Sequence, residues 1–121
     1  MNIQKIKISI EKGKEDKYMK VIGITSCTCG IAHTYMAREK LIDAGKKLGI
    51  DVKIETQGSG GVEYALSEQD VNEADCVLLA TDVAVSGTER FKGKPVVKVG
   101  VSTAIKSPEH LLKQIQEKLN K

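Results

Sequence analysis

The chain has 121 residues, about the size of one domain, of which 40% are hydrophobic and 29% charged. A core of this size needs no disulfide or metal for stability. The net charge of +3 arises in residues 1–20, with six lysines and three acids, so residues 21–121 are neutral and carry no basic surface for nucleic acid. Because the chain has neither a membrane-length apolar run nor a signal peptide, we expect a cytoplasmic protein whose three cysteines are thiols.

Residues 1–19 form a leader distinct from the rest of the chain. Ile6, Ile8 and Ile10 alternate with polar residues, as in a half-exposed strand, and residues 11–17 are strongly charged. The leader is therefore predicted to be an extra edge strand or partly disordered, with partial disorder favoured. The domain itself is expected over residues 20–121.

From residue 20 onward, strand patterns alternate with helix patterns. Strands are predicted at 20–26, 50–56, 74–81 and 95–101, and helices at 30–48, after Ser67, and from Pro108 onward. Ser67 with Asp70 forms a capping-box pattern, 57–61 is a glycine loop, and 85–94 is a loop or short helix. This order predicts an α/β fold with a four-stranded parallel sheet, order 2-1-3-4, and helices on both faces, which is a flavodoxin-like or Rossmann-like sandwich. Ligands of such sheets bind beyond the carboxyl ends of the strands, so the loops of interest are 26–32, 56–61, 81–88 and 100–107.

The strongest chemical signal is the run SCTCGIAHT at residues 26–34, between the first strand and the first helix. Backbone amides of residues 28–34 can surround one anion there, and a helix N-terminus lowers a cysteine pKa from about 8.5 to between roughly 3.5 and 7.5. Cys27 is thus a candidate nucleophile for covalent phosphoryl transfer. The alternative, that Cys27 is a small buried residue, is less favoured because Gly30, His33 and Thr34 share the same turn.

These residues resemble the phosphorylation loop of fructose-type IIB components of the bacterial phosphoenolpyruvate-dependent sugar phosphotransferase system. The resemblance extends over about residues 19–106 and includes the following runs: Cys27-x-x-Gly30-Ile31-Ala32-His33-Thr34-Tyr35-Met36-Ala37, Glu55-Thr56-Gln57-Gly58, Ala74-Asp75, Ala80-Thr81-Asp82 and Arg90-Phe91-x-Gly93-Lys94-Pro95.

The resemblance implies a transferase in which Cys27 becomes a phosphocysteine. The phosphoryl group would come from a phosphohistidine of the IIA component and pass to a sugar held by the membrane component IIC, with which the domain associates peripherally. No cofactor is implied. The residues expected to bind the phosphoryl group are Thr28, Cys29, Gly30, Ile31, Ala32, His33 and Thr34.

The chain departs from the family at two positions of the loop. The family usually reads Cys-Pro-Thr-Gly, whereas this chain reads Cys27-Thr28-Cys29-Gly30. Without the proline the turn is less rigid, and Cys29 offers a weak S–H donor in place of a hydroxyl.

Other functions were weighed against this one. A cysteine phosphatase would have arginine six residues after the nucleophile, where this chain has His33. A phosphorylatable regulatory module no longer coupled to transport also fits the motifs. Gln57 and Asp82 are possible secondary site residues; Gln57 has amide donors to offer, whereas Asp82 would repel a phosphoryl group and is expected to orient or support. No metal site is predicted, and Cys76 is assigned to the core.

Overall fold

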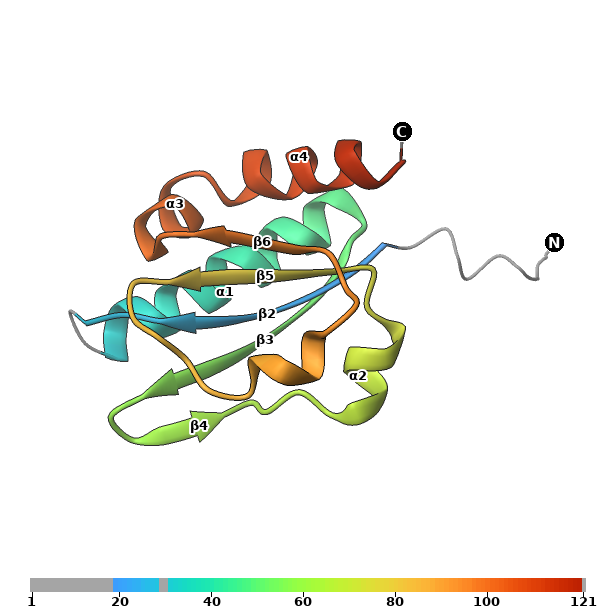
Figure 1. Ribbon diagram of the computed structural model, residues 1–121. Coiled ribbons are helices and arrows are strands. Elements are labelled where there is room, and N and C mark those ends of the chain that lie inside the picture. Colours follow the sequence, from blue (N-terminus) through green and yellow to red (C-terminus); the bar gives the residue numbers. More distant parts are fainter. Residues whose placement is uncertain (1–18, 29–30, 121) are drawn as a thin grey trace, which may run out of the picture.

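Four strands of the sheet are parallel and lie in the predicted order, with the second, first, third and fourth side by side (Figure 1). The computed structural model describes residues 19–28 and 31–120. The parallel strands are β2 (Lys20–Ser26), β3 (Asp51–Gly58), β5 (Cys76–Thr81) and β6 (Val96–Val99). The predicted α/β fold is therefore confirmed. The predicted leader, except for Met19, lies outside the described residues.

A fifth strand corrects the prediction of a purely parallel sheet. β4 (Gly61–Glu63) pairs antiparallel with the end of β3, where the sequence predicted only a glycine loop. Gly61 permits the reversal because its φ of +101° is one that L side chains rarely adopt. Every residue of β4 is exposed, so the alternation of buried and exposed positions that identifies a strand is absent.

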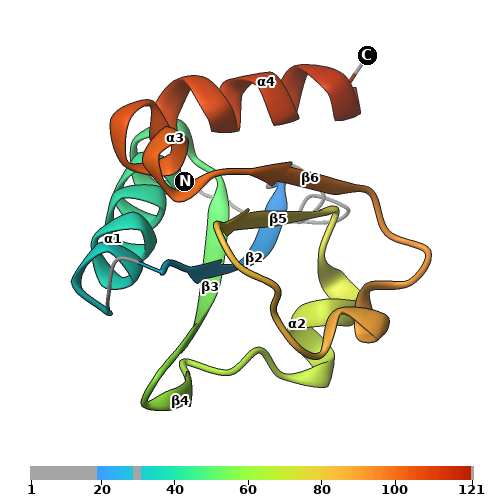
Figure 2. The same cartoon turned by 60° about the vertical axis from the view of Figure 1, so that its left-hand side comes forward.

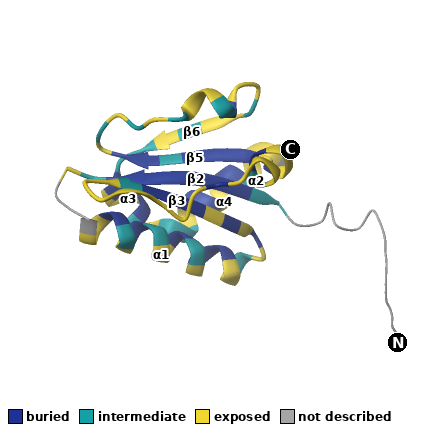
Figure 3. Cartoon of the chain, turned by 90° about the horizontal axis from the view of Figure 1, so that it is seen from below, coloured by how far each residue is buried: buried dark blue, intermediate teal, exposed yellow. Residues whose placement is uncertain are grey.

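Helices cover both faces of the sheet, as predicted (Figures 2 and 3). One face carries α1 (Ile31–Leu48), α3 (Val101–Lys106) and α4 (Pro108–Asn120). The other carries α2 (Glu68–Glu73) and the 3₁₀ helix η2 (Thr88–Phe91). The capping box of α2 is confirmed: the Ser67 hydroxyl accepts from the amide of Asp70, and the Asp70 carboxylate accepts from the amide of Ser67.

Helix α3 corrects the prediction of a strand reaching Val101 followed by a loop over 100–107. β6 ends at Val99, and Gly100, which precedes α3, provides no side-chain cap. The amide of Val101 instead donates to Asp82, at the end of β5. Because the cap comes from a residue distant in sequence, no local signal announces this helix.

Alternating residues of the central strands build two separate cores. The strands β2 and β5 that contribute to both are mostly buried, as their dark blue colour in Figure 3 shows. The larger core faces α1, α3 and α4 and includes Val21, Ile54, Leu78, Leu41, Ala104 and Leu112. The smaller core lies under α2 and η2 and includes Ile22, Ile24, Val77, Leu66, Val71 and Phe91. With both faces covered, the parallel strands are held firmly, and their carboxyl ends form a fixed edge.

The first half of α1 is fastened to the edge of the sheet by side chains that meet the β3–β4 hairpin. The Tyr35 hydroxyl donates a hydrogen bond to the Glu63 carboxylate, which raises the pKa of Tyr35. The Arg38 guanidinium stacks over the Tyr64 ring, 3.6 Å from its centroid, and Arg38 Nε donates to the carbonyl of Ile54 at 3.0 Å. These contacts hold the helix that follows the Cys27 loop.

Candidate functional site

Cys27 and Asp82 lie beside each other because β2 and β5 are neighbouring parallel strands. Their register places Ser26 opposite Thr81, so the next residue of each strand reaches the same edge of the sheet. The amide of Asp82 also donates to the carbonyl of Ser26 at 2.9 Å. The predicted convergence of the loops 26–32 and 81–88 is thus seen in the structure.

The Asp82 carboxylate connects the Cys27 thiol to the start of α3. Cys27 Sγ donates to Asp82 Oδ2 at 3.3 Å, and the amide of Val101 donates to Asp82 Oδ1 at 3.1 Å. Both oxygens of the carboxylate are therefore engaged. The carboxylate thus links the end of β2 to the start of α3, and the orienting role expected for Asp82 stays a prediction.

A cavity of about 300 Å³ opens beside Cys27, between the first turns of α1 and helix α3. Its wall is apolar at Met36, Val101 and Ile105 and polar at His33, Asp82, Ser102 and Lys106. Asp82 is the only carboxylate among the described residues that line it. The space is open to solvent and is large enough for a phosphoryl group together with part of the molecule that carries it.

The predicted phosphoryl-binding loop is described only in part. Thr28 is exposed in a turn, Cys29 and Gly30 lie outside the described residues, and α1 begins at Ile31. The first amides of a helix, here those of residues 31–33, have no acceptor within the helix and are available to an anion.

The side chains of the first turn of α1 face different surroundings. Ala32 and His33 are exposed, and His33 lines the cavity. Thr34 is 1% exposed, its carbonyl accepts from the Thr25 hydroxyl at 3.0 Å, and it is not part of the cavity wall. Of the predicted side chains His33 and Thr34, only His33 is thus within reach of a group bound beside Cys27.

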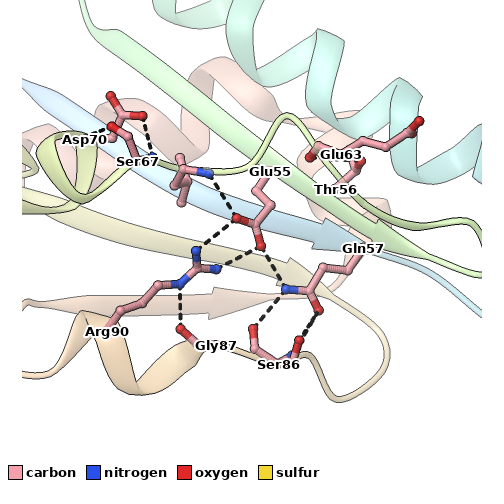
Figure 4. A network of polar contacts seen from close by, with 10 residues as sticks. Glu55, Thr56, Gln57, Glu63, Ser67, Asp70, Ser86, Gly87 and Arg90 are labelled. Carbon is pink, nitrogen blue, oxygen red and sulfur yellow. Dashed lines mark hydrogen bonds and ion pairs between the residues drawn. The ribbon is translucent and has the colours of Figure 1, made fainter.

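A buried ion pair holds the segment that follows β5 (Figure 4). Arg90 donates to both oxygens of Glu55, at 3.1 and 2.8 Å, while the Glu55 side chain is only 1% exposed. The amide of Leu66 and the side chain of Gln57 also donate to this carboxylate, at 3.0 and 2.9 Å, and Arg90 Nε donates to the carbonyl of Gly87 at 2.6 Å. Burial by itself raises the pKa of Glu55, but these hydrogen bonds together hold it below its ordinary value.

Gln57 lies at the end of β3 and turns toward the 82–88 loop. Its Nε2 donates to the carbonyl of Ser86 and its Oε1 accepts from the amide of Ser86, both at 2.9 Å (Figure 4). The amide group thus binds the backbone four residues beyond Asp82. In the described geometry Gln57 acts on the site through that loop, and direct contact with a phosphoryl group stays a prediction.

Sequence reasoning missed the part of the cavity contributed by helices. It named the loop 100–107 as a place to search but assigned no residue there, and it did not single out Met36 as part of the site. Ser102 and Lys106 are four residues apart, the spacing that places two side chains on one face of a helix. This spacing could have identified both residues, but it indicates a shared face only in a helix, and the sequence predicted a loop at 100–107.

The described residues provide neither a metal site nor a membrane-spanning helix, and one of their cysteines is buried. Within the described residues, no group of three or more His, Cys, Asp or Glu side chains is placed to hold a metal ion. None of the helices in that part of the chain is long and apolar enough to cross a membrane. Cys76 is 1% exposed in the larger core, as predicted, and its burial raises the pKa of the thiol.

Comparisons with known proteins show which family the chain is similar to. The model of the family described as "PTS system, Lactose/Cellobiose specific IIB subunit" matches residues 22–114. The PTS system fructose-like EIIB component 2 of Escherichia coli (strain K12) is 45% identical over 100 residues, which are 83% of this chain and 94% of that protein. The PTS system fructose-specific EIIABC component of Bacillus subtilis (strain 168) is 40% identical over 95 residues, which are 78% of this chain and 15% of that longer protein.

A solved structure supports the same assignment. The solution structure of the Enzyme IIB subunit of the PTS system from Escherichia coli K12 is similar with a TM-score of 0.79 and 35% identity, covering 84% of this chain and 94% of that one. Fold, site and comparisons together define a domain of the sugar phosphotransferase system. The chain belongs to the IIB family of that system and is a IIB component of the fructose-like type.

Proposed function

We propose that the protein is a phosphoryl carrier whose acceptor is Cys27. The observation that carries this proposal is the position of Cys27, at the carboxyl end of β2, beside an open cavity and directly before the N-terminus of α1. A thiol in this position can reach a donor from solvent, and the first amides of α1 can stabilise charge on the transferring group.

The carrier works through two displacements at phosphorus. In the first, Cys27 Sγ attacks the phosphorus of a phosphohistidine; the S–P bond forms, the P–N bond breaks, and the imidazole nitrogen keeps the electron pair and takes up a proton. The thiol proton leaves through Asp82 Oδ2, its hydrogen-bond acceptor at 3.3 Å, and passes to solvent. In the second, a sugar hydroxyl oxygen attacks the same phosphorus; the O–P bond forms, Cys27 departs as a thiolate, and the hydroxyl proton is lost to solvent.

The proposed binding set is the loop and first turn that follow Cys27. Amides of residues 28–34 supply the donors, and His33, exposed at the cavity wall, supplies a side chain within reach. Gln57 and Asp82 hold the neighbouring loop in place.

The proposed partners are a IIA component as phosphohistidine donor and a membrane component IIC that holds the sugar. The similarity to a segment of a longer protein named an EIIABC component supports a domain that works next to such components. Peripheral association with a membrane permease, on its cytoplasmic side, follows from that role. The matching family description names lactose and cellobiose, whereas the curated relatives are named fructose-like or fructose-specific. In the proposed relay the membrane component holds the sugar and therefore selects it.

Phosphorylation by a reconstituted system tests the proposal. The full chain is incubated with phosphoenolpyruvate, the general phosphotransferase proteins and a fructose-type IIA, and the product is analysed by intact mass. We expect one phosphoryl group that is stable to acid, labile to iodine and absent from Cys27→Ser.

Cys76→Ala is the matched control, because this thiol lies in the core on the same sheet and should leave labelling intact. Absence of label on the unmodified chain would overturn the proposal. Hydrolysis of an aryl phosphate by the unmodified chain, lost in Cys27→Ser, would point to a phosphatase instead.

A further inference from the structure

Asp82 is placed so that its carboxylate interacts with the sulfur that is to carry the phosphoryl group. Its Oδ2 accepts from Cys27 Sγ at 3.3 Å, its Oδ1 accepts from the amide of Val101 at 3.1 Å, and its own amide donates to Ser26 at 2.9 Å. Since backbone and side chain are both held, the carboxylate cannot turn away from the sulfur without giving up the cap of α3.

This arrangement favours one state of Cys27 and opposes the other. An unmodified thiol has a proton to donate to Asp82. A phosphocysteine has none, and its phosphoryl group brings a charge of between about −1.5 and −2 next to an ionised carboxylate. Asp82 is the only carboxylate among the described residues that line the cavity, whereas Lys106 in the same wall is a cation. Among the described residues that line the cavity, Asp82 is thus the one whose charge destabilises the phosphocysteine.

Resting on the proposed function, we infer that Asp82, through its direct contact with the sulfur, sets the phosphoryl-transfer potential of Cys27. It stabilises the unloaded thiol and destabilises the phosphocysteine, so that a phosphoryl group accepted from the donor is passed on instead of being retained. A carrier needs this property, because an S–P bond that is too stable in its site would stop the relay.

The expected size follows from the contact that is lost on loading. A hydrogen bond to a charged group is worth about 1.5–3 kcal/mol, which corresponds to a change of roughly 10- to 100-fold in an equilibrium constant. Removing the charge of Asp82 should therefore shift the equilibrium between thiol and phosphocysteine toward phosphocysteine by that factor.

The experiment compares Asp82→Asn with Asp75→Asn in the full chain. Asparagine keeps an oxygen that can accept from the amide of Val101, and it replaces the charged oxygen that accepts from Cys27 by an uncharged NH2 group, which donates. Asp75 is a matched control, since its Oδ2 also accepts from a backbone amide, that of Lys20 at 2.9 Å, but at the opposite end of β5. Each chain is equilibrated with an excess of phosphorylated and free IIA in a fixed ratio, and the fraction of phosphocysteine is measured by phosphorus NMR and intact mass.

We expect the ratio of phosphocysteine to thiol to rise roughly 10- to 100-fold in Asp82→Asn and to stay at the level of the unmodified chain in Asp75→Asn. Transfer from the Asp82→Asn phosphocysteine to the sugar should slow. A purely structural role would change thermal stability without moving this ratio. Should Asp82→Asn fail to fold, Asp82→Ser removes the same charge and retains a short acceptor for the cap of α3.

The outcomes separate this inference from the proposed function. If the unmodified chain is labelled at Cys27 and Asp82→Asn gives the same ratio or a lower one, the inference is wrong and the carrier function stands. If the unmodified chain takes up no label at Cys27, the carrier function is wrong and the inference falls with it.

Discussion

The ion pair between Glu55 and Arg90 provides a sharp test of how the site is held. We consider Arg90→Met, which retains an unbranched apolar chain and removes the guanidinium. The change deletes both hydrogen bonds from Arg90 to Glu55, at 3.1 and 2.8 Å, and the one to Gly87 at 2.6 Å. It leaves a carboxylate that is only 1% exposed without its cation.

The loss in free energy of unfolding can be estimated from the contacts that Glu55 keeps in Arg90→Met. Removing one partner of a buried ion pair typically costs about 3–5 kcal/mol. Here Glu55 keeps its hydrogen bonds from Gln57 and from the amide of Leu66, and the Arg90 side chain is 30% exposed, which lets water approach. The lower end of the range therefore applies, and we expect the free energy of unfolding to fall by about 3 kcal/mol in Arg90→Met.

Urea denaturation measures this loss, with Lys53→Met as the matched control. Lys53 bonds Asp70 at 2.9 Å, nearly the distance of the buried pair, but its side chain is 56% exposed. Such a surface pair is worth less than about 1 kcal/mol. A loss in Arg90→Met no larger than that in Lys53→Met would refute the argument from burial.

The pH dependence gives a second check on the same variant. In the unmodified chain the pKa of Glu55 is held below its ordinary value. The ionised Glu55 therefore contributes to the free energy of unfolding at any pH above the ordinary pKa of a glutamate, and this contribution is lost as the pH falls through the lowered pKa. Without Arg90, burial dominates and raises the pKa of Glu55 above its value in the unfolded chain. Protonation of Glu55 then stabilises the folded variant, so the difference in free energy of unfolding between the two proteins should narrow as the pH falls from neutrality toward the ordinary pKa of a glutamate. A difference that widens on acidification would contradict this account.

Two further predictions concern the scaffold. In Gly45→Ala the new Cβ would lie 2.5 Å from Val52 Cγ2. Although alanine has the better helix propensity, we expect thermal unfolding to show a net loss of stability of about 1–2 kcal/mol. The control Gly60→Ala, whose new Cβ would have no atom within 4 Å, should leave the stability unchanged. Lys94 Nζ donates at 2.9 Å to two carbonyls at the end of α2, so Lys94→Met should lose about 1–3 kcal/mol in urea denaturation. Lys92→Met, which changes an exposed lysine nearby, should lose less than about 0.5 kcal/mol.

The parallel sheet was predictable because its two central strands, β2 and β5, are buried on both faces and therefore form apolar runs rich in β-branched residues. The residues at 20–26 and 74–81 are of this kind, and the structure buries almost all of β2 and β5. The capping box at Ser67 was equally readable, since its two residues are three apart. The sequence did not predict β4 and α3, because neither has a local signal. Every residue of β4 is exposed, and α3 is capped by Asp82, which lies at the end of another strand.

The site shows the same division between local and distant information. Topology alone placed Cys27 and Asp82 at one edge of the sheet, and their 3.3 Å contact follows from the register of β2 and β5. The orientation of Gln57 was not predictable, because it depends on Ser86 and on the Glu55–Arg90 pair. Hydrogen-bond partners so far apart along the chain leave no pattern in the sequence between them.

The ion pair also explains what two of the family motifs encode. The runs that begin at Glu55 and Arg90 were recognised as separate similarities, and the structure shows that they are the two halves of one buried contact. Together with Gln57 they place the segment after β5, and hence the carboxylate beside Cys27. None of the contacts described in this network involves Thr28. We therefore expect the departures from the resemblance at residues 28 and 29 to change the donors offered to the phosphoryl group and the stiffness of the turn, and we expect the frame that positions Asp82 against the nucleophile to be kept.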